Sequence, residues 1–246
     1  MTTCVLVHGA WHGAWCWQST AEQLRGRGLG CVTVDLPAQD PQAGLLDSVR
    51  AVLHAWAAAG ARGPALVVGH SMGGLVTPLL AGRLPVVGLV FVCALVPRPG
   101  RSATDVVADE PTFSAGWSRR SAAQVTHPDG STSWPAERAS EAIEAMYHDC
   151  DPGVAAAAAA MLRPQCWGPF DEPSPLTAWP SVPAAWVLTT DDRVVDPRQQ
   201  RARAAEHGGT LVELPGGHCP MLSRPDALAD AIAGFARSVE GTAPSV

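Results

Sequence analysis

Short, largely apolar runs rich in β-branched residues recur along this chain, and helix-like stretches separate them. They are apolar on both faces rather than alternating, which is typical of parallel strands covered by helices on both sides. The strand order along the chain, with a helix between successive strands, predicts one mostly parallel six-stranded α/β sheet flanked by helices. The expected strands lie at 4–8, 31–35, 65–69, 86–93, 184–189 and 209–213. The expected helices lie at 16–28, 43–60, 72–83, 197–206 and 225–238.

Residues 97–175 interrupt this alternation. A proline-bearing polar stretch lies at each end of the segment, and no run inside it has a convincing strand pattern. Helical patterns occupy 139–147 and 153–162, the second with six consecutive alanines. An insertion of this length between two strands is more typical of a small helical cap than of a loop. We therefore expect a core made of 1–96 and 176–246, with the cap inserted after the fourth strand.

The composition excludes several classes of function. Of the 246 residues, 47% are hydrophobic and 16% are charged, so the chain can bury a sizeable core and is not disordered as a whole. The net charge of −6 leaves no basic footprint for a nucleic acid. All 17 basic residues are arginines. Without lysine the chain can form neither a pyridoxal-phosphate Schiff base nor a Walker-type phosphate loop.

The cysteines and the N-terminal residues bear on the compartment and on metals. Seven cysteines are scattered through apolar runs without a C-x-x-C pair, which indicates reduced, mostly buried thiols and no metal site. The start MTTCVLVHG lacks the features of a secretory signal, and no apolar stretch is long enough to span a membrane. We expect a cytoplasmic protein, monomeric or homodimeric, that needs no cofactor and binds no membrane.

The pattern G-x-S-x-G appears at Gly69-His70-Ser71-Met72-Gly73, directly after an expected strand and before an expected helix. In this setting the serine occupies a sharp, strained turn that exposes its hydroxyl above the sheet, and the flanking glycines avoid collisions. Ser71 is therefore a candidate nucleophile. The alternative is a glycine-rich turn in which the serine only caps the helix. Pro78 lies inside the expected helix and should kink or shorten it.

A nucleophilic serine needs a base, and the base needs an acid that orients it. His218 follows the last expected strand and two glycines, at the same carboxyl edge of the sheet as Ser71. Asp191 and Asp192 both follow the end of the strand 184–189, and spacing alone does not choose between them. Either carboxylate could instead be a solvated loop charge or a helix cap, and an acid after the strand 86–93 is a further alternative.

An oxyanion hole requires two backbone N–H groups. One should belong to Met72, the residue after the nucleophile, and the other to the loop after the first strand. In that loop Gly9 permits a sharp bend, and Ala10 offers its N–H.

Taken together, these motifs resemble the α/β-hydrolase superfamily, and within it the compact branch of plant methylesterases, hydroxynitrile lyases and bacterial esterase-like relatives. The resemblance implies that Asp192 is the acid and that Ala10 and Met72 are the oxyanion donors. Hydroxynitrile lyases of this branch carry Thr where Gly9 stands and Lys where Cys219 stands, so lyase activity is disfavoured. The motifs are LVHGAWHGAWCW, DLPAQ, VVGHSMGGLV, LVFVCALVPRPG, TTDDRVVDP and GGHCPMLSRPDALAD in the core, with YHDCD and LRPQ in the cap.

The resemblance predicts a cofactor-independent serine hydrolase that cleaves a small or medium carboxylic ester through an acyl-enzyme. Two alternatives are a non-hydrolytic enzyme of specialised metabolism, such as a cyclase, lyase or acyltransferase, and a ligand-binding receptor on the same fold. The residues expected to line an apolar substrate pocket are Trp11, His12, Trp117, Trp134 and Trp167.

Overall fold

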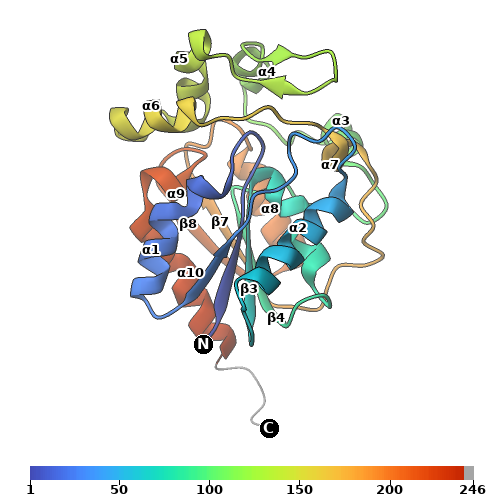
Figure 1. The fold of residues 1–246 in the computed structure, drawn as a ribbon, viewed down its shortest axis with the longest axis vertical. Coiled ribbons are helices and arrows are strands. Elements are labelled where there is room, and N and C mark those ends of the chain that lie inside the picture. The colour runs from blue at the N-terminus through green and yellow to red at the C-terminus, as the bar shows by residue number, and fades with distance from the viewer. Residues whose placement is uncertain (241–246) are drawn as a thin grey trace.

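The computed structural model describes residues 1–240 and contains one six-stranded parallel sheet (Figure 1). The strands lie side by side in the order β2-β1-β3-β4-β7-β8, and every neighbouring pair is parallel. The predicted α/β sheet is confirmed, although the last six residues of the predicted core lie outside the described part. The strands are β1 (Thr3–Val7), β2 (Gly30–Thr33), β3 (Ala65–His70), β4 (Val86–Val92), β7 (Ala184–Thr189) and β8 (Thr210–Leu214).

Helices cover both faces of this sheet. In Figure 1, α1 and α10 lie side by side on one face and α2 lies on the other. Helix α10 buries Leu228, Ile232, Phe235 and Val239, a spacing that forms one apolar stripe against the sheet. Phe235 fits there because Gly88 of β4 has no side chain: a Cβ atom would lie 2.8 Å from its ring. The core helices are α1 (Gln18–Gly26), α2 (Leu45–Ala58), α8 (Pro197–His207), α9 (Pro220–Ser223) and α10 (Pro225–Glu240), and a 3-10 helix (Ala14–Trp17) precedes α1.

The helix expected over 72–83 is not an α-helix. The segment forms two 3-10 helices, Ser71–Leu75 and Thr77–Leu80. Pro78 has no N–H for a continuous helical ladder. The hydroxyl of Thr77 donates to the Gly73 carbonyl oxygen at 3.0 Å, so this oxygen accepts from a side chain at the junction of the two helices.

Part of the chain between β4 and β7 forms a layer above the carboxyl ends of the strands (Figure 1). Helices α4, α5 and α6 lie in this layer, whereas α3 and α7 lie lower, beside the core. The predicted limits of the cap, 97–175, stay a prediction. The elements of this segment are α3 (Ala103–Asp109), α4 (Trp117–Ser121), β5 (Val125–Thr126), β6 (Thr132–Ser133), a 3-10 helix (Ala136–Arg138), α5 (Ala139–Ala142), a π-helix (Ile143–Tyr147), α6 (Pro152–Ala160) and α7 (Gly168–Asp171).

The expectation that this segment contains no strand is wrong. Strands β5 and β6 form a short antiparallel pair. The connecting turn contains Asp129-Gly130, a dipeptide that favours hairpins because Gly130 adopts a left-handed conformation, with φ 81°. The carboxylate of Asp129 accepts hydrogen bonds from the backbone and hydroxyl of Ser131, which fixes the turn.

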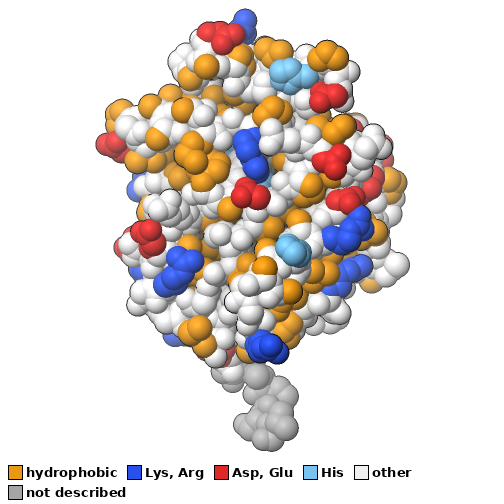
Figure 2. Space-filling model, viewed as in Figure 1, with side chains coloured by type: hydrophobic (Ala, Val, Ile, Leu, Met, Phe, Trp, Pro, Cys, Tyr) orange, Lys and Arg blue, Asp and Glu red, His pale blue; other side chains and the backbone are white. Residues whose placement is uncertain are grey.

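The cysteines, the surface charges and the composition of the helices can be compared with what the sequence predicted. All seven cysteines are free, and five of them are buried, as predicted. In Figure 2, acidic and basic side chains are interspersed over the visible face rather than gathered by sign. Across residues 1–240, the structure has no helix of the length and apolarity that a membrane span requires.

Candidate active site

Ser71 lies at the turn between β3 and the following 3-10 helix, with its backbone in the left-handed region at φ 51°. The glycines around it are required by close approach. A Cβ atom at Gly73 would lie 2.7 Å from the His8 carbonyl oxygen, and one at Gly69 would collide with the Thr77 hydroxyl. A Cβ atom at Gly9 would lie 2.7 Å from the Cβ of Ser71 itself. The turn at residues 69–73, called the serine elbow below, is therefore tight and strained, as the sequence predicted.

His218 and Asp192 form a buried hydrogen-bonded pair at the same edge of the sheet. The Nδ1 atom of His218 lies 2.9 Å from Oδ2 and 3.0 Å from Oδ1 of Asp192. The backbone N–H groups of Val194 and Val195 also donate to Oδ1, at 2.8 and 3.0 Å. These bonds orient the carboxylate toward the imidazole and leave Nε2 of His218 available for another partner.

Asp191 has a different environment. Its side chain is exposed, and its Oδ2 lies 2.9 Å from Nε2 of His148 in the cap. Of the two adjacent carboxylates that the sequence could not separate, only Asp192 contacts His218 in the structure.

His70, which precedes Ser71 in the chain, contacts the residue His218. The His70 and His218 rings lie 4.7 Å apart, and Nε2 of His70 donates to the His218 carbonyl oxygen at 2.9 Å. No hydrogen bond joins the Ser71 hydroxyl to the His218 ring among the described residues. In proteins without a bound substrate such a bond is often long and forms only in the complex.

Two backbone N–H groups lie next to Ser71. Ala10 and Met72 line the same cavity as Ser71. The N–H of Met72 is in the first turn of its 3-10 helix, where amides have no partner within the helix. The N–H of Ala10 donates to no other described residue. Both groups can therefore donate to a negatively charged oxygen.

Buried neutral histidines support the loop that carries Ala10. Burial lowers the pKa of His8 to about 4 and that of His12 to about 3. Nδ1 of His12 donates to the Ala10 carbonyl oxygen at 2.7 Å, which leaves Nε2 as an acceptor. In the same way, Nε2 of His8 accepts from the Leu36 N–H at 3.0 Å. These rings have structural partners at both nitrogens.

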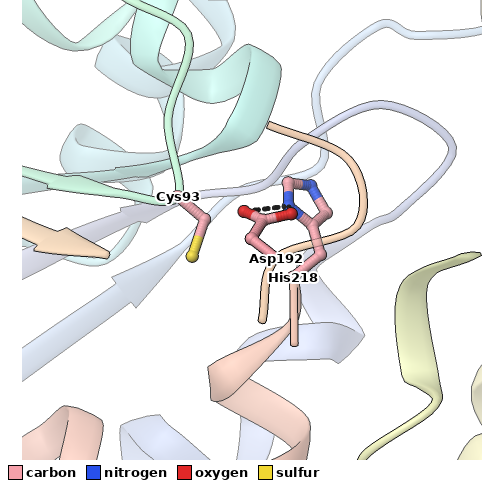
Figure 3. A group of neighbouring side chains, drawn as sticks. All are labelled: Cys93, Asp192 and His218. Carbon is pink, nitrogen blue, oxygen red and sulfur yellow. Dashed lines mark hydrogen bonds and ion pairs between the residues drawn. The ribbon is translucent and has the colours of Figure 1, made fainter. Parts of the chain in front are cut away.

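A third side chain, Cys93, joins the pair of His218 and Asp192 (Figure 3). Cys93 was not among the residues predicted for the site, although it ends an expected strand at the same sheet edge. Its thiol, the carboxylate and the imidazole lie within 4.8 Å of one another, and in Figure 3 the carboxylate stands between the other two. The set does not fit a metal ion, because Asp192 and His218 already bond to each other. Burial also raises the pKa of Cys93 well above its usual value, so it is a thiol rather than the thiolate that binds metals.

A cavity of about 460 Å³ opens on Ser71. Its wall is mostly apolar and aromatic. Three of the predicted pocket residues, Trp11, Trp117 and Trp167, line it, together with Phe113 and Phe170, which the sequence analysis did not single out. Their position in the cap near the expected tryptophans was the available signal.

The other two predicted pocket residues lie outside the cavity wall. Trp134 packs behind the wall, with its ring 5.9 Å from Trp11 and 6.5 Å from Trp117. His12 is 1% exposed and bonds to Ala10 and Tyr147, so it supports the wall from within the protein.

Comparison with known proteins gives one family. A family model described as "Alpha/beta hydrolase family" matches residues 4–231. The pyrethroid hydrolase of Sphingobium wenxiniae is 29% identical over 247 residues, which cover 96% of this chain and 88% of that protein. Putative methylesterase 12, chloroplastic, of Arabidopsis thaliana is 28% identical over 242 residues, which cover 91% of this chain and 68% of that protein.

Solved structures give the same fold. The crystal structure of the pyrethroid hydrolase PytH has a TM-score of 0.80 at 26% identity and covers 97% of this chain and 98% of its own. A methylesterase protein, MES16, from Arabidopsis has a TM-score of 0.74 at 20% identity, with 98% and 100% coverage, and shows the fold alone. The relatives agree with the resemblance found in the sequence and support the predicted enzyme class, a carboxylic ester hydrolase.

Proposed function

Because this chain belongs to the α/β hydrolase family, we propose that it is a cofactor-independent serine esterase with Ser71, His218 and Asp192 as its catalytic triad. The observation that carries the proposal is the strained serine elbow beside a buried histidine–aspartate pair, under a cavity that opens on the serine. This combination supports nucleophilic catalysis more than a ligand-binding role, since simple binding has no need for a strained serine next to a base.

The geometry supports the following sequence of steps. Nε2 of His218 takes the proton of the Ser71 hydroxyl as its oxygen attacks the ester carbonyl carbon. The N–H groups of Ala10 and Met72 stabilise the negative oxygen of the tetrahedral intermediate. His218 then protonates the leaving alcohol, and an acyl group remains on Ser71. Water, activated by the same imidazole, releases the acid, while Asp192 keeps Nδ1 protonated throughout.

The cavity favours an ester with at least one apolar group of moderate size. Its volume is within the usual range for small-molecule sites, and Trp11, Trp117 and Trp167 offer ring faces to an apolar ligand. The relative named pyrethroid hydrolase supports testing pyrethroid-type esters, and the methylesterase relatives support testing methyl esters.

A panel of chromogenic esters with increasing acyl length tests the proposal. We expect multiple turnovers by the wild type and a loss of about 10³-fold or more in kcat in Ser71→Ala. Equal turnover in Ser71→Ala would refute the covalent mechanism. A failure of the wild type on all esters, with tight binding of one of them, would favour the receptor or the non-hydrolytic enzyme.

A second pair of variants tests the pocket. Trp117→Ala, which removes part of the wall, should lower kcat/KM about tenfold for bulky esters and less for acetate esters. Trp134→Ala is the matched control, because this ring touches the same tryptophans from behind the wall. Identical chain-length profiles in the two variants would contradict this assignment of the pocket.

A further inference from the structure

Three consecutive cap residues, Tyr147, His148 and Asp149, contact three different loops of the active site. Tyr147 ends the π-helix Ile143–Tyr147, and His148 and Asp149 follow it directly. The roles proposed above for Ser71, His218 and Asp192 do not use them. Each makes one hydrogen bond across the boundary between cap and core.

Tyr147 binds the loop that carries the oxyanion donor. Its hydroxyl lies 2.8 Å from Nε2 of His12, and both side chains are buried. Because Nδ1 of His12 donates to the Ala10 carbonyl oxygen and the ring is neutral, Nε2 carries no proton. The Tyr147 hydroxyl is therefore the donor. The chain of bonds runs from the cap through His12 to Ala10.

Asp149 binds the loop that carries the base. Its Oδ2 accepts from the N–H of Gly217 at 2.8 Å, and Gly217 immediately precedes His218. The contact requires glycine, since a Cβ atom at Gly217 would lie 2.7 Å from Oδ1 of Asp149 and 2.6 Å from Cε1 of His148. The carboxylate can thus hold the backbone of the base loop at close range.

His148 binds the loop that carries the acid. Its Nε2 lies 2.9 Å from Oδ2 of Asp191, the neighbour of Asp192. The N–H of Asp191 in turn donates to the Gly216 carbonyl oxygen at 2.9 Å, which joins the acid loop to the base loop. The three cap side chains therefore meet the oxyanion, acid and base loops within one short segment.

We propose that Tyr147, His148 and Asp149 form a positioning clamp that holds the three catalytic loops in register. The clamp rests on the function proposed above. It does not touch the reacting atoms: it fixes the distance between Ser71, the base and the oxyanion donors. Displacements of about 1 Å in such an arrangement are enough to lower rates about 100-fold. The cap then has a second role besides lining the pocket, because its seating sets the geometry of the reaction.

Asp149→Ala is the main test, with Asp149→Asn as the conservative variant and Asp151→Ala as the matched control. The amide of Asn retains an oxygen that can accept from Gly217. Asp151 belongs to the same cap, but its carboxylate accepts from Gly153 and Val154 at the start of α6 and contacts none of the three loops. For each variant, kcat, KM, the melting temperature and the rate of Ser71 modification by an aryl phosphonate are measured.

We expect Asp149→Ala to lower kcat and the phosphonylation rate by about tenfold or more, with KM changed by less than about threefold. Asp149→Asn should recover most of the loss. Asp151→Ala should lower the melting temperature but keep kcat within about threefold of the wild type. If Asp149→Ala does not fold, Tyr147→Phe gives the same test, because it removes only the donor to His12, and kcat should fall by about threefold or more.

Two results would overturn the clamp. One is an Asp149→Ala kcat less than about tenfold below the wild type, or no effect of Tyr147→Phe where that variant is needed. The other is an equal loss in Asp151→Ala, which would mean that only cap stability matters. The proposed esterase function is judged separately, on the wild type. If the phosphonate does not modify wild-type Ser71 and Ser71→Ala retains turnover, the triad itself is wrong.

Discussion

Mild acid should destabilise this protein steeply, because several of its histidines are buried in the neutral form. Burial lowers the pKa of His8 to about 4 and of His12 to about 3, and it lowers the pKa of His70 well below the ordinary 6.5. Burial also lowers the pKa of the half-buried His207. In the unfolded chain these groups regain ordinary pKa values. The unfolded state therefore binds more protons than the folded state as the pH falls below about 6.5.

The size of the effect follows from these values. At about pH 5, which is 1.5 units below the unfolded pKa, each neutral buried histidine costs about 2 kcal/mol relative to the protonated, unfolded form. His8 and His12 together give about 4 kcal/mol. The lowered pKa of His70 acts in the same direction. Domains of ordinary stability have about 5–15 kcal/mol in all. The loss should begin near pH 6.5 and stop growing below the folded pKa values.

The assay is urea unfolding followed by tryptophan fluorescence at several pH values between about 7.5 and 5. From His8 and His12 alone, the free energy of unfolding should approach a slope of about 2–3 kcal/mol per pH unit near pH 5, and His70 should make the slope steeper. Acidic groups with lowered pKa, such as Asp47 and Asp129, titrate below this window and do not contribute to it. The matched control is His54→Gln, which alters an exposed histidine and should leave the slope unchanged. A free energy of unfolding that changes by less than about 1 kcal/mol between pH 7 and 5 would refute the reasoning.

Three further predictions concern the site. Asp192→Asn should lower kcat by several orders of magnitude, while Asp191→Asn lowers it by no more than several-fold; steady-state kinetics checks this, and the reverse order would move the acid by one residue. Gly9→Ala should lower kcat about 100-fold and reduce the melting temperature, because the new Cβ atom would lie 2.7 Å from the Cβ of Ser71 and 2.9 Å from Nδ1 of His70; wild-type kinetics in this variant would contradict the close approach. Addition of a chelator should leave the rate of ester hydrolysis unchanged. A loss of activity that zinc or manganese restores would contradict a metal-independent mechanism.

Most features that depend on neighbouring residues in the chain were predicted correctly from the sequence. The apolar runs give the strands of the sheet, and Gly69-His70-Ser71-Met72-Gly73 gives the elbow, because both depend on neighbours along the chain. The failure at 72–83 is also local in origin. The apolar residues there have a helical spacing, but Pro78 and the Thr77 bond to Gly73 favour two 3-10 helices.

Side-chain contacts between segments that are far apart in the chain could not be predicted from the sequence. His12 was expected in the pocket, yet a partner 135 residues away, Tyr147, holds it in the interior. Cys93 joins Asp192 only because β4 and β7 are neighbours in the sheet. The choice between Asp191 and Asp192 likewise depends on which carboxylate faces His218, and spacing in the sequence carries no information about that direction.

Three non-glycine residues among those described have left-handed backbones, and they sit around one site: Trp11 at φ 61°, Ser71 at φ 51° and Cys93 at φ 46°. Each such conformation costs about 1–3 kcal/mol. The sheet edge that we propose as the active site therefore stores about 3–9 kcal/mol of backbone strain, comparable with the free energy of unfolding of a whole domain. We therefore expect substitutions that raise the melting temperature without loss of activity to lie in the rest of the molecule. Substitutions that relax these three backbones should stabilise the fold and lower the rate of the proposed reaction.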